Sequence, residues 1–415
     1  MNKKRFSVSI IYFVIVVLTL LMRVASALDV YSWLGVKDDE AFWDVMIQIV
    51  IFGVVPFVSY MLFVCGRGDD FLPAFPMRQN DDETKNDDGQ IENPQPSEDE
   101  NAAFLQDGAT ENGKDAIFGE THETEDDSAA ETVAQFENVQ NLVETDAGAP
   151  IENSETKKHG KASVMFKEFF EDFGFKKVSG KNFGFTVLLA VCMIIFTSGF
   201  SMIWQVALSL IGFTHVPSST DYSSVGILFK ELFFVAVLPG VFEEFTHRGL
   251  LFSGYKKTGW KYVLLSALLF ALMHQNIVQT GYTFVDGVAM ALVFYYTGSI
   301  FPSMFMHFLN NAVSVMLGYG AQNGGFFGFI NSIENWLFST PIGLVITFVI
   351  VIACGVGAVL ILWRMRKDAE AHGRVPKTPF LDTDTLLLVK DPMFVLTVAV
   401  GIVATTFSFV WGMLR

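Results

Sequence analysis

Long apolar runs are the feature that most constrains how this chain can fold. Stretches of about 18 to 25 residues with few charges recur along it, and this is the length that a helix needs to cross a hydrocarbon core of about 30 Å. The candidate segments are 7–23, 44–65, 184–212, 225–251, 260–279, 284–299, 301–319, 341–363 and 392–413. With 51% hydrophobic residues, the sequence predicts an all-α, polytopic transmembrane bundle of about nine spanning helices.

The acidic residues are concentrated in one part of the chain. The formal net charge is −16, but residues 69–155 hold 25 of the 44 acidic residues and only three basic ones. The rest of the chain is therefore slightly basic. The acidic part is also rich in Asn, Gly and Thr and has no periodic apolar face, so we expect a long disordered cytoplasmic loop over residues 67–160.

The Lys and Arg residues predict the orientation of the bundle, because they accumulate on the cytoplasmic side of membrane segments. If Lys3–Arg5 lie inside, nine crossings also place Lys256 and Arg364 inside. The loops expected on the opposite side, near 213–224, 280–283 and 320–340, contain no Lys or Arg. The N-terminal run, which ends in Ala-Ser-Ala at 25–27, also fits a cleaved signal peptide, and both interpretations stay open.

Ionisable residues inside the expected spans narrow the search for a functional site, because they are costly in a membrane and usually functional. They are Lys230, Glu231, Glu243, Glu244, His247, Arg248, His274, Asp286 and His307. Lys230 and Glu231 lie near the outer end of their helix, where we expect them to reach the interface. Asp286 lies near the start of the expected sixth helix, and we expect a structural role for it.

The fourth expected helix carries the first motif. Pro239 and Gly240 precede Glu243 and Glu244, so we expect a kink just before the carboxylates. Glu244 and Arg248 share a helix face at the i,i+4 spacing and can form an ion pair. Glu243 then points about 100° away and is free for chemistry. His247 could pair with Glu243 or face another helix.

Two further pairs share a face on later helices, Phe270 with His274 and His307 with Asn311. A Glu, two His and an Asn can supply a base for water, a group that orients it and donors for an oxyanion. The combination Glu-Glu-x-x-x-Arg, Phe-x-x-x-His and His-x-x-x-Asn resembles the CPBP family of intramembrane proteases. This family includes type II CAAX prenyl endopeptidases and bacteriocin-processing or immunity (Abi-like) proteins, and the resemblance covers about 183–320.

The resemblance implies an intramembrane endopeptidase that acts on a membrane-associated protein or peptide. Glu243 would activate water that His274 also holds, His307 and Asn311 would stabilise the oxyanion, and Glu244 with Arg248 would support the site. Glu243, His274 and His307 are also ligand types for a metal such as zinc, and the sequence does not choose between the two mechanisms. We also expect a multi-pass protein of a bacterial plasma membrane. The depths of Glu243, His274 and His307 along their expected helices indicate a site that, on average, opens toward the cytoplasm.

We therefore expect five regions. They are two membrane helices in 1–66, the acidic loop in 67–160, an amphipathic membrane-surface segment in 161–182, the protease core in 183–320 and two further helices in 321–415. The substrate could be a CAAX-type C-terminus or a bacteriocin or leader peptide. A non-catalytic immunity or scaffold protein and a proton-coupled transporter are the alternatives. The sequence indicates the bilayer and the substrate as partners and gives no sign of nucleic-acid binding. The oligomeric state stays open.

Overall fold

The structure is a computed structural model of the whole chain, and it describes residues 3–27, 46–65, 154–215, 220–255, 260–375 and 391–414. The chain divides into two compact units, of which the first comprises Met1–Ala74 and Lys158–Arg415 and holds the apolar helices. The expected acidic loop lies outside the described residues, except that the chain is already helical from Ser154.

The described residues form helices and no strand, so the all-α prediction is confirmed. The helices of the first half of the bundle are α1 (Lys3–Ala27), η1 (Met46–Val54) continued by α4 (Val55–Phe63), α6 (Ser154–Asp172) and α7 (Gly180–Leu210). A rod of five short helices follows, consisting of α8 (Val225–Glu231), η2 (Leu232–Val237), α9 (Leu238–Glu244), η3 (Phe245–Leu250) and α10 (Leu251–Tyr255). The remaining helices are α11 (Lys261–Met273), α12 (Ile277–Thr297), α13 (Phe301–Asn323), α14 (Gly325–Ser339), α15 (Pro341–Ala371) and α17 (Pro392–Met413).

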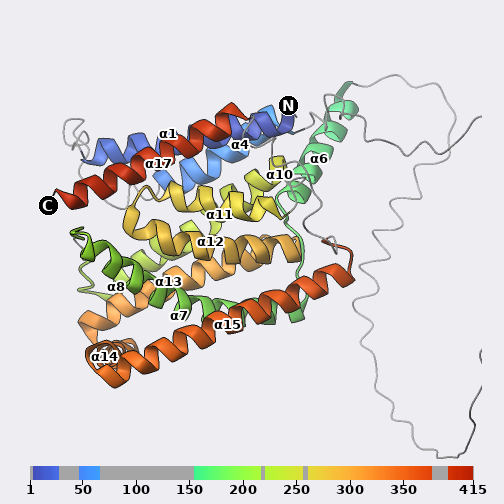
Figure 1. Cartoon of the computed structure of the whole chain (residues 1–415). Coiled ribbons are helices and arrows are strands. Elements are labelled where there is room, and N and C mark those ends of the chain that lie inside the picture. The colour runs from blue at the N-terminus through green and yellow to red at the C-terminus, as the bar shows by residue number, and fades with distance from the viewer. Residues whose placement is uncertain are drawn as a thin grey trace, which may run out of the picture. The chain divides into compact units, whose positions relative to one another are not determined.

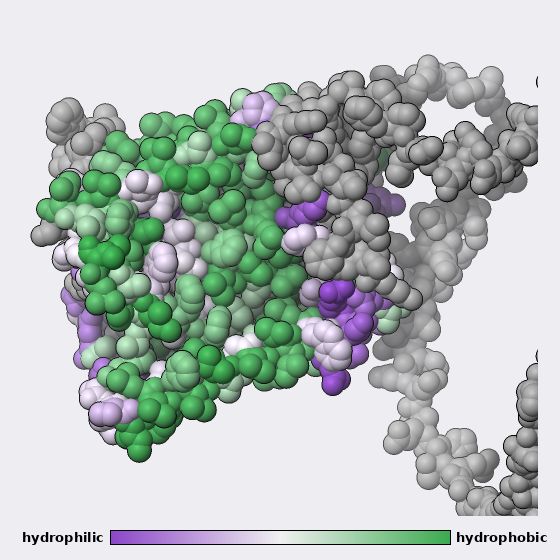
Figure 2. Space-filling view, viewed as in Figure 1, coloured by the Kyte–Doolittle hydropathy of each residue, from purple (hydrophilic) through white to green (hydrophobic). Residues whose placement is uncertain are grey.

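Six of the described helices are long and apolar enough to cross a membrane, so the chain is an integral membrane protein. They are Lys4–Ala25, Gly180–Leu210, Val225–Tyr255, Ile277–Thr297, Pro341–Ala371 and Pro392–Met413. Two more apolar helices, Ile47–Phe63 and Lys261–Met273, are shorter, so about nine crossings stays a prediction. Apolar side chains also cover the outer face of α15 (Figure 2), where Val345, Phe348 and Val359 are more than 60% exposed, as lipid-facing residues are.

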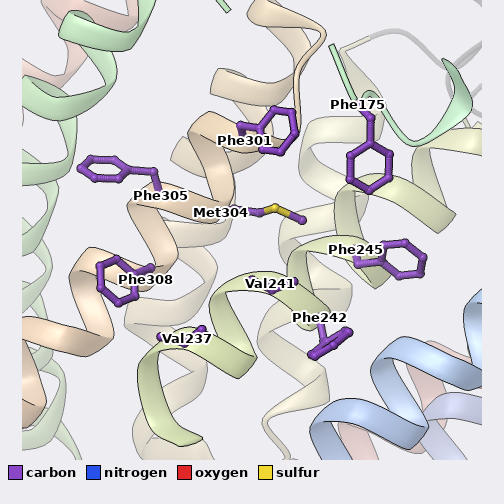
Figure 3. A pocket seen from close by; sticks show the side chains of 9 residues that line it. All are labelled: Phe175, Val237, Val241, Phe242, Phe245, Phe301, Met304, Phe305 and Phe308. Carbon is purple, nitrogen blue, oxygen red and sulfur yellow. The ribbon is translucent and has the colours of Figure 1, made fainter. Parts of the chain in front are cut away.

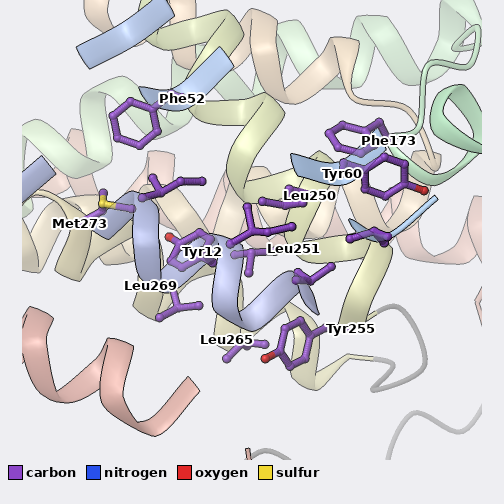
Figure 4. Close-up of a cluster of buried hydrophobic side chains, with 14 of the residues drawn as sticks. Tyr12, Phe52, Tyr60, Phe173, Leu250, Leu251, Tyr255, Leu265, Leu269 and Met273 are labelled. Carbon is purple, nitrogen blue, oxygen red and sulfur yellow. The ribbon is translucent and has the colours of Figure 1, made fainter. Parts of the chain in front are cut away.

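Helices distant in sequence lie side by side in the bundle (Figure 1). Helix α1 packs against α17, α10 and α4, while α12 packs against α11, α7 and α15. One large buried cluster (Figure 4) joins Tyr12 of α1, Tyr60 of α4 and Phe173 to residues of η3, α10 and α11. The N-terminal helices and the segment after α6 are thus packed into the core that holds the motif-bearing helices.

Two expected helix boundaries are wrong. The sequence predicts a fifth helix that runs to residue 279, but α11 ends at Met273. It predicts that the sixth helix begins at residue 284, but α12 begins at Ile277. Gln275 has a φ of 49°, in the left-handed region, and the side chain of Asn276 caps α12 by accepting a hydrogen bond from the backbone N–H of Val278. A strained residue and an N-cap therefore end one helix and start the next.

Two segments expected to be loops are helical. Residues 280–283 lie inside α12, and α14 occupies most of 320–340. Because α12 starts earlier than expected, Asp286 lies in its middle and is 8% exposed rather than near the surface. The position expected for Asp286 is therefore wrong.

Candidate active site

A buried ion pair holds the second carboxylate of the first motif. Arg248 Nη1 donates to Glu244 Oε1 at 2.7 Å, and both side chains are fully buried. The i,i+4 pair predicted from the sequence is confirmed. Further hydrogen bonds offset part of the cost of removing such a pair from water, and Arg248 Nη2 donates one to the carbonyl oxygen of Gly287 at 3.1 Å.

The same carboxylate reaches the third motif. His307 Nδ1 of α13 lies 3.0 Å from Glu244 Oε1, so Glu244 bridges Arg248 and His307 across two helices. The other carboxylate oxygen, Oε2, is buried without a hydrogen-bond partner among the described residues. Glu244 therefore orients a histidine of the expected site directly, which is more than the supporting role expected for it.

Gly240 allows this bridge to form. A Cβ atom at Gly240 would lie 3.0 Å from the backbone nitrogen and 3.1 Å from the Cα atom of Phe308. Backbone atoms of α13 cannot move aside as a flexible side chain can, so α9 and α13 approach this closely only with glycine at the crossing. The close approach places Glu244 within hydrogen-bond distance of His307.

The ring of Phe270 is the centre around which the charged and imidazole groups gather. The Arg248 guanidinium carbon lies 4.7 Å from the ring centroid, a cation–π contact. His274 and His307 meet the ring edge-on at centroid distances of 4.9 and 5.5 Å. The motif phenylalanine therefore brings the second and third motifs together around one buried side chain.

His274 is the first residue after α11, in the short turn that leads to α12. Its Nδ1 lies 2.8 Å from the carbonyl oxygen of Phe270. Because a carbonyl can only accept, Nδ1 carries the hydrogen and Nε2 is left as the acceptor of the neutral ring. Non-helical backbone within a membrane bundle is tolerated where it is buried in protein or lines a cavity, and this turn places His274 at the edge of the group of polar side chains.

Glu243 faces away from Glu244, as the 100° rotation per residue predicts. Its Oε1 accepts a hydrogen bond of 2.9 Å from Gln48 Nε2 of η1. Glu243 is partly buried and interacts electrostatically with both His274 and His307. The structure thus brings Glu243, His274 and His307 into one region, although no direct hydrogen bond joins Glu243 to either imidazole among the described residues.

Asn311 contacts the helix that carries the glutamates. Its Nδ2 donates to the backbone oxygen of Val235 at 2.9 Å. Val235 lies four residues before Pro239, which has no N–H to offer that carbonyl in an α-helix. Two π-helical segments, η2 and η3, flank α9, so the expected irregularity near Pro239 takes the form of π-turns. Asn311 therefore satisfies a carbonyl at the irregular turn.

Residues that the sequence reasoning left unassigned surround this group. His247 does not pair with Glu243; its Nδ1 lies 2.9 Å from the Tyr12 hydroxyl, and its ring meets Phe270 edge-on at 5.0 Å. Asp286 lies beside Thr197 and interacts electrostatically with His307 and Arg248. Tyr12 and Gln48 are polar side chains within apolar runs, a signal that could have identified them.

The expected metal ligands do not form a metal centre. Among the described residues, no group of three or more His, Cys, Asp or Glu side chains is arranged to hold a metal ion, and this includes Glu243, His274 and His307. The residues present therefore do not fit a zinc ion in this arrangement.

An apolar cavity of about 450 Å³ lies between the helices that carry the glutamates and His307 (Figure 3). Its lining side chains are almost all aromatic or aliphatic, and they are Phe175, Val237, Val241, Phe242, Phe245, Phe301, Met304, Phe305 and Phe308. Val241 and Phe242 directly precede the two glutamates and Phe245 directly follows them, so the cavity and the polar residues share the same helices.

A family model of Rce1-like type II CAAX prenyl endopeptidases matches residues 225–313. The match begins at α8 and ends two residues after Asn311, so it contains all three motifs, and the resemblance inferred from them is confirmed. It is shorter than the 183–320 expected, and α1, η1 and α4 lie outside it. Comparisons with curated proteins and with solved structures found no match. Since the family is one of membrane proteases, the match supports a peptidase.

Proposed function

We propose that this chain is an intramembrane endopeptidase that hydrolyses a peptide bond of a membrane-associated protein or peptide with a glutamate-activated water. The observation that carries the proposal is the arrangement of His274 and His307, from separate helices, around Phe270 and beside the buried Glu244–Arg248 pair, with Glu243 near enough to both histidines to interact electrostatically. These are the three motifs within the segment that the protease family model matches.

Glu243 is the general base in this proposal. Its carboxylate removes a proton from water while the water oxygen bonds to the scissile carbonyl carbon, and His274 Nε2 orients the water by accepting a hydrogen bond from its second O–H, which stays on the oxygen. The C–N bond then breaks, and the proton held by Glu243 passes to the leaving amine. Each step uses protein groups alone, and atoms and charge balance over the cycle.

His307 and Asn311 stabilise the oxyanion formed on the carbonyl oxygen. His307 acts in its imidazolium form, with Nδ1–H paired to Glu244 and Nε2–H left for the substrate oxygen. One N–H of the Asn311 amide is used by the Val235 oxygen, and an amide nitrogen carries two hydrogens. Asn311 thus has a second donor for the substrate.

The apolar cavity between α9 and α13 is suited to the lipid-like or apolar part of such a substrate. A CAAX-type C-terminus and a bacteriocin or leader peptide are both membrane-proximal segments of this kind. The distribution of Lys and Arg sets the orientation of the helices, and together with the family resemblance it leads us to infer a bacterial plasma membrane and a substrate taken from the cytoplasmic side.

Purified protein in lipid nanodiscs, supplied with quenched fluorescent peptides of both substrate classes, tests the proposal. Wild type should release fluorescence, and Glu243→Gln should lower turnover by at least about a thousandfold while the folded yield is unchanged. Glu171→Gln, a change at an exposed glutamate of α6, is the matched control. Full activity of Glu243→Gln, or biological rescue by Glu243→Ala, would favour a scaffold or immunity protein.

Substrates in cells can be found by comparing protein termini in strains that express wild type or Glu243→Gln. New termini that depend on Glu243 identify the cleaved bonds. A protein that cleaves nothing in either assay but drives pH-dependent uptake in liposomes would be a transporter.

A further inference from the structure

We propose that Gln48 of η1 is a positioning residue that fixes the carboxylate of Glu243 for hydrolysis; this inference rests on the proposed function. Gln48 lies in the N-terminal part of the chain, outside residues 225–313 that the family model matches. The catalytic glutamate would then be oriented by a helix that does not belong to the matched segment.

The position of Gln48 in the sequence calls for a polar partner. It is the one amide in η1, whose sequence Met-Ile-Gln-Ile-Val-Ile-Phe-Gly-Val is otherwise apolar. An amide within a membrane helix is costly unless it forms hydrogen bonds. Gln48 Nε2 donates to Glu243 Oε1 at 2.9 Å, a contact across 195 residues of sequence. The partner that Gln48 finds is therefore the proposed general base.

This contact gives the two carboxylate oxygens of Glu243 different roles. With Oε1 held by Gln48, the lone pairs of Oε2 are left for the water. Hydrogen bonds to a charged acceptor are about twice as strong as neutral ones and fix direction as well as distance. A misplacement of about 1 Å at a reacting group can reduce the rate about a hundredfold, so a fixed carboxylate matters for turnover.

The backbone that carries Gln48 is itself anchored to the glutamate helix. The Thr246 hydroxyl donates to the Phe52 carbonyl oxygen at 2.8 Å. A Cβ atom at Gly53 would lie 2.7 Å from Cδ1 of Phe242, so η1 approaches α9 closely. These contacts, at Phe242 and Thr246, lie before and after the glutamates in the sequence, and they hold η1 in register with Glu243.

The second polar atom of Gln48 supports a role inside the site rather than in packing alone. Gln48 Oε1 is buried and has no hydrogen-bond partner within the part of the chain that the structure describes. A buried acceptor left without a partner is destabilising, and a residue kept only for stability would not leave one. The free acceptor is available to a donor that arrives with water or substrate.

Gln48→Met tests the inference, since methionine keeps the length of the side chain and removes both polar atoms. We expect kcat to fall about ten- to hundredfold, with KM changed less than about twofold and the melting temperature not lowered. Gln205→Met is the matched control, because Gln205 is an exposed glutamine of α7 that bonds locally to Ser201. The control should retain wild-type kcat.

The outcomes separate this inference from the proposed function. If wild type is active, Glu243→Gln is inactive and Gln48→Met keeps the kcat of the control, the role of Gln48 is refuted and the protease proposal stands. A fall in kcat accompanied by an equal loss of folded protein also refutes positioning. Activity retained by Glu243→Gln would overturn both.

Discussion

His307 and Arg248 share one oxygen atom of Glu244. His307 Nδ1 lies 3.0 Å and Arg248 Nη1 2.7 Å from Oε1. The three side chains come from η3, α9 and α13 and are at most 6% exposed. Consequently the catalytic and supporting residues expected from the sequence are not cleanly separated, because Glu244, a supporting residue, contacts His307 of the proposed oxyanion site.

Glu244→Gln should therefore impair both stability and activity. The substitution leaves the Arg248 guanidinium buried without its counter-ion, a change that typically costs about 3–5 kcal/mol in proteins, and removes the charge beside His307. We expect lower thermal stability in detergent and at least a hundredfold lower peptide cleavage. Glu171→Gln, at an exposed position, should change neither. Wild-type stability of Glu244→Gln would contradict the buried pair.

Gly240→Ala should weaken cleavage by separating two helices. The added Cβ atom would lie 3.0 Å from the Phe308 backbone nitrogen, so α9 and α13 must move apart and lengthen the Glu244–His307 contact. The typical cost of overpacking is about 1–3 kcal/mol. Gly184→Ala is the control, because a Cβ atom there meets nothing within 4 Å; it should be neutral or stabilising by up to about 1 kcal/mol. Equal behaviour of the two variants in thermal unfolding and cleavage would count against the close approach.

Local patterns predicted the all-α fold, the Glu244–Arg248 pair and the opposite direction of Glu243, because apolar run length and the i,i+4 spacing are read directly from the sequence. They did not predict where α11 ends. Apolar residues resume at Ile277 after three polar positions, and the left-handed Gln275 and the cap at Asn276 separate the two helices there. A single residue at positive φ leaves no periodic signal.

Contacts between helices could not be predicted from the sequence, for a different reason. Tyr12 binds His247 across 235 residues and Gln48 binds Glu243 across 195. No spacing rule relates positions on separate helices, so His247 could be placed beside Glu243 or against another helix with equal justification. The motifs identify the proposed catalytic residues in the sequence. The residues that contact them from other helices can be identified only once the helix packing is known.

Removal of metal should leave the proposed reaction intact. The base and the oxyanion donors are all side chains in the glutamate mechanism, and Glu243, His274 and His307 do not form a metal-binding group in the structure. We expect cleavage by protein dialysed against a strong chelator to stay within about twofold of the untreated rate. Loss of activity that added zinc restores would contradict the mechanism and support the metal alternative.

Asn311→Ala separates a structural from a catalytic role when it is combined with Pro239→Ala. Alone, Asn311→Ala leaves the Val235 carbonyl without its donor, at a cost of about 1–3 kcal/mol. Alanine at position 239 supplies a backbone N–H four residues after Val235, which can bond to that carbonyl when the π-turn becomes an α-turn. The double variant should therefore lose less stability than the two single effects added, by about 1 kcal/mol in thermal unfolding.

Cleavage should not follow the same pattern. If Asn311 also donates to the oxyanion, the double variant regains stability but stays at least about tenfold less active than Pro239→Ala. Recovery of activity together with stability would instead mean that Asn311 acts only through the Val235 carbonyl, leaving His307 as the sole side-chain donor among the motif residues. The cycle thus decides whether the last residue of the third motif takes part in the chemistry.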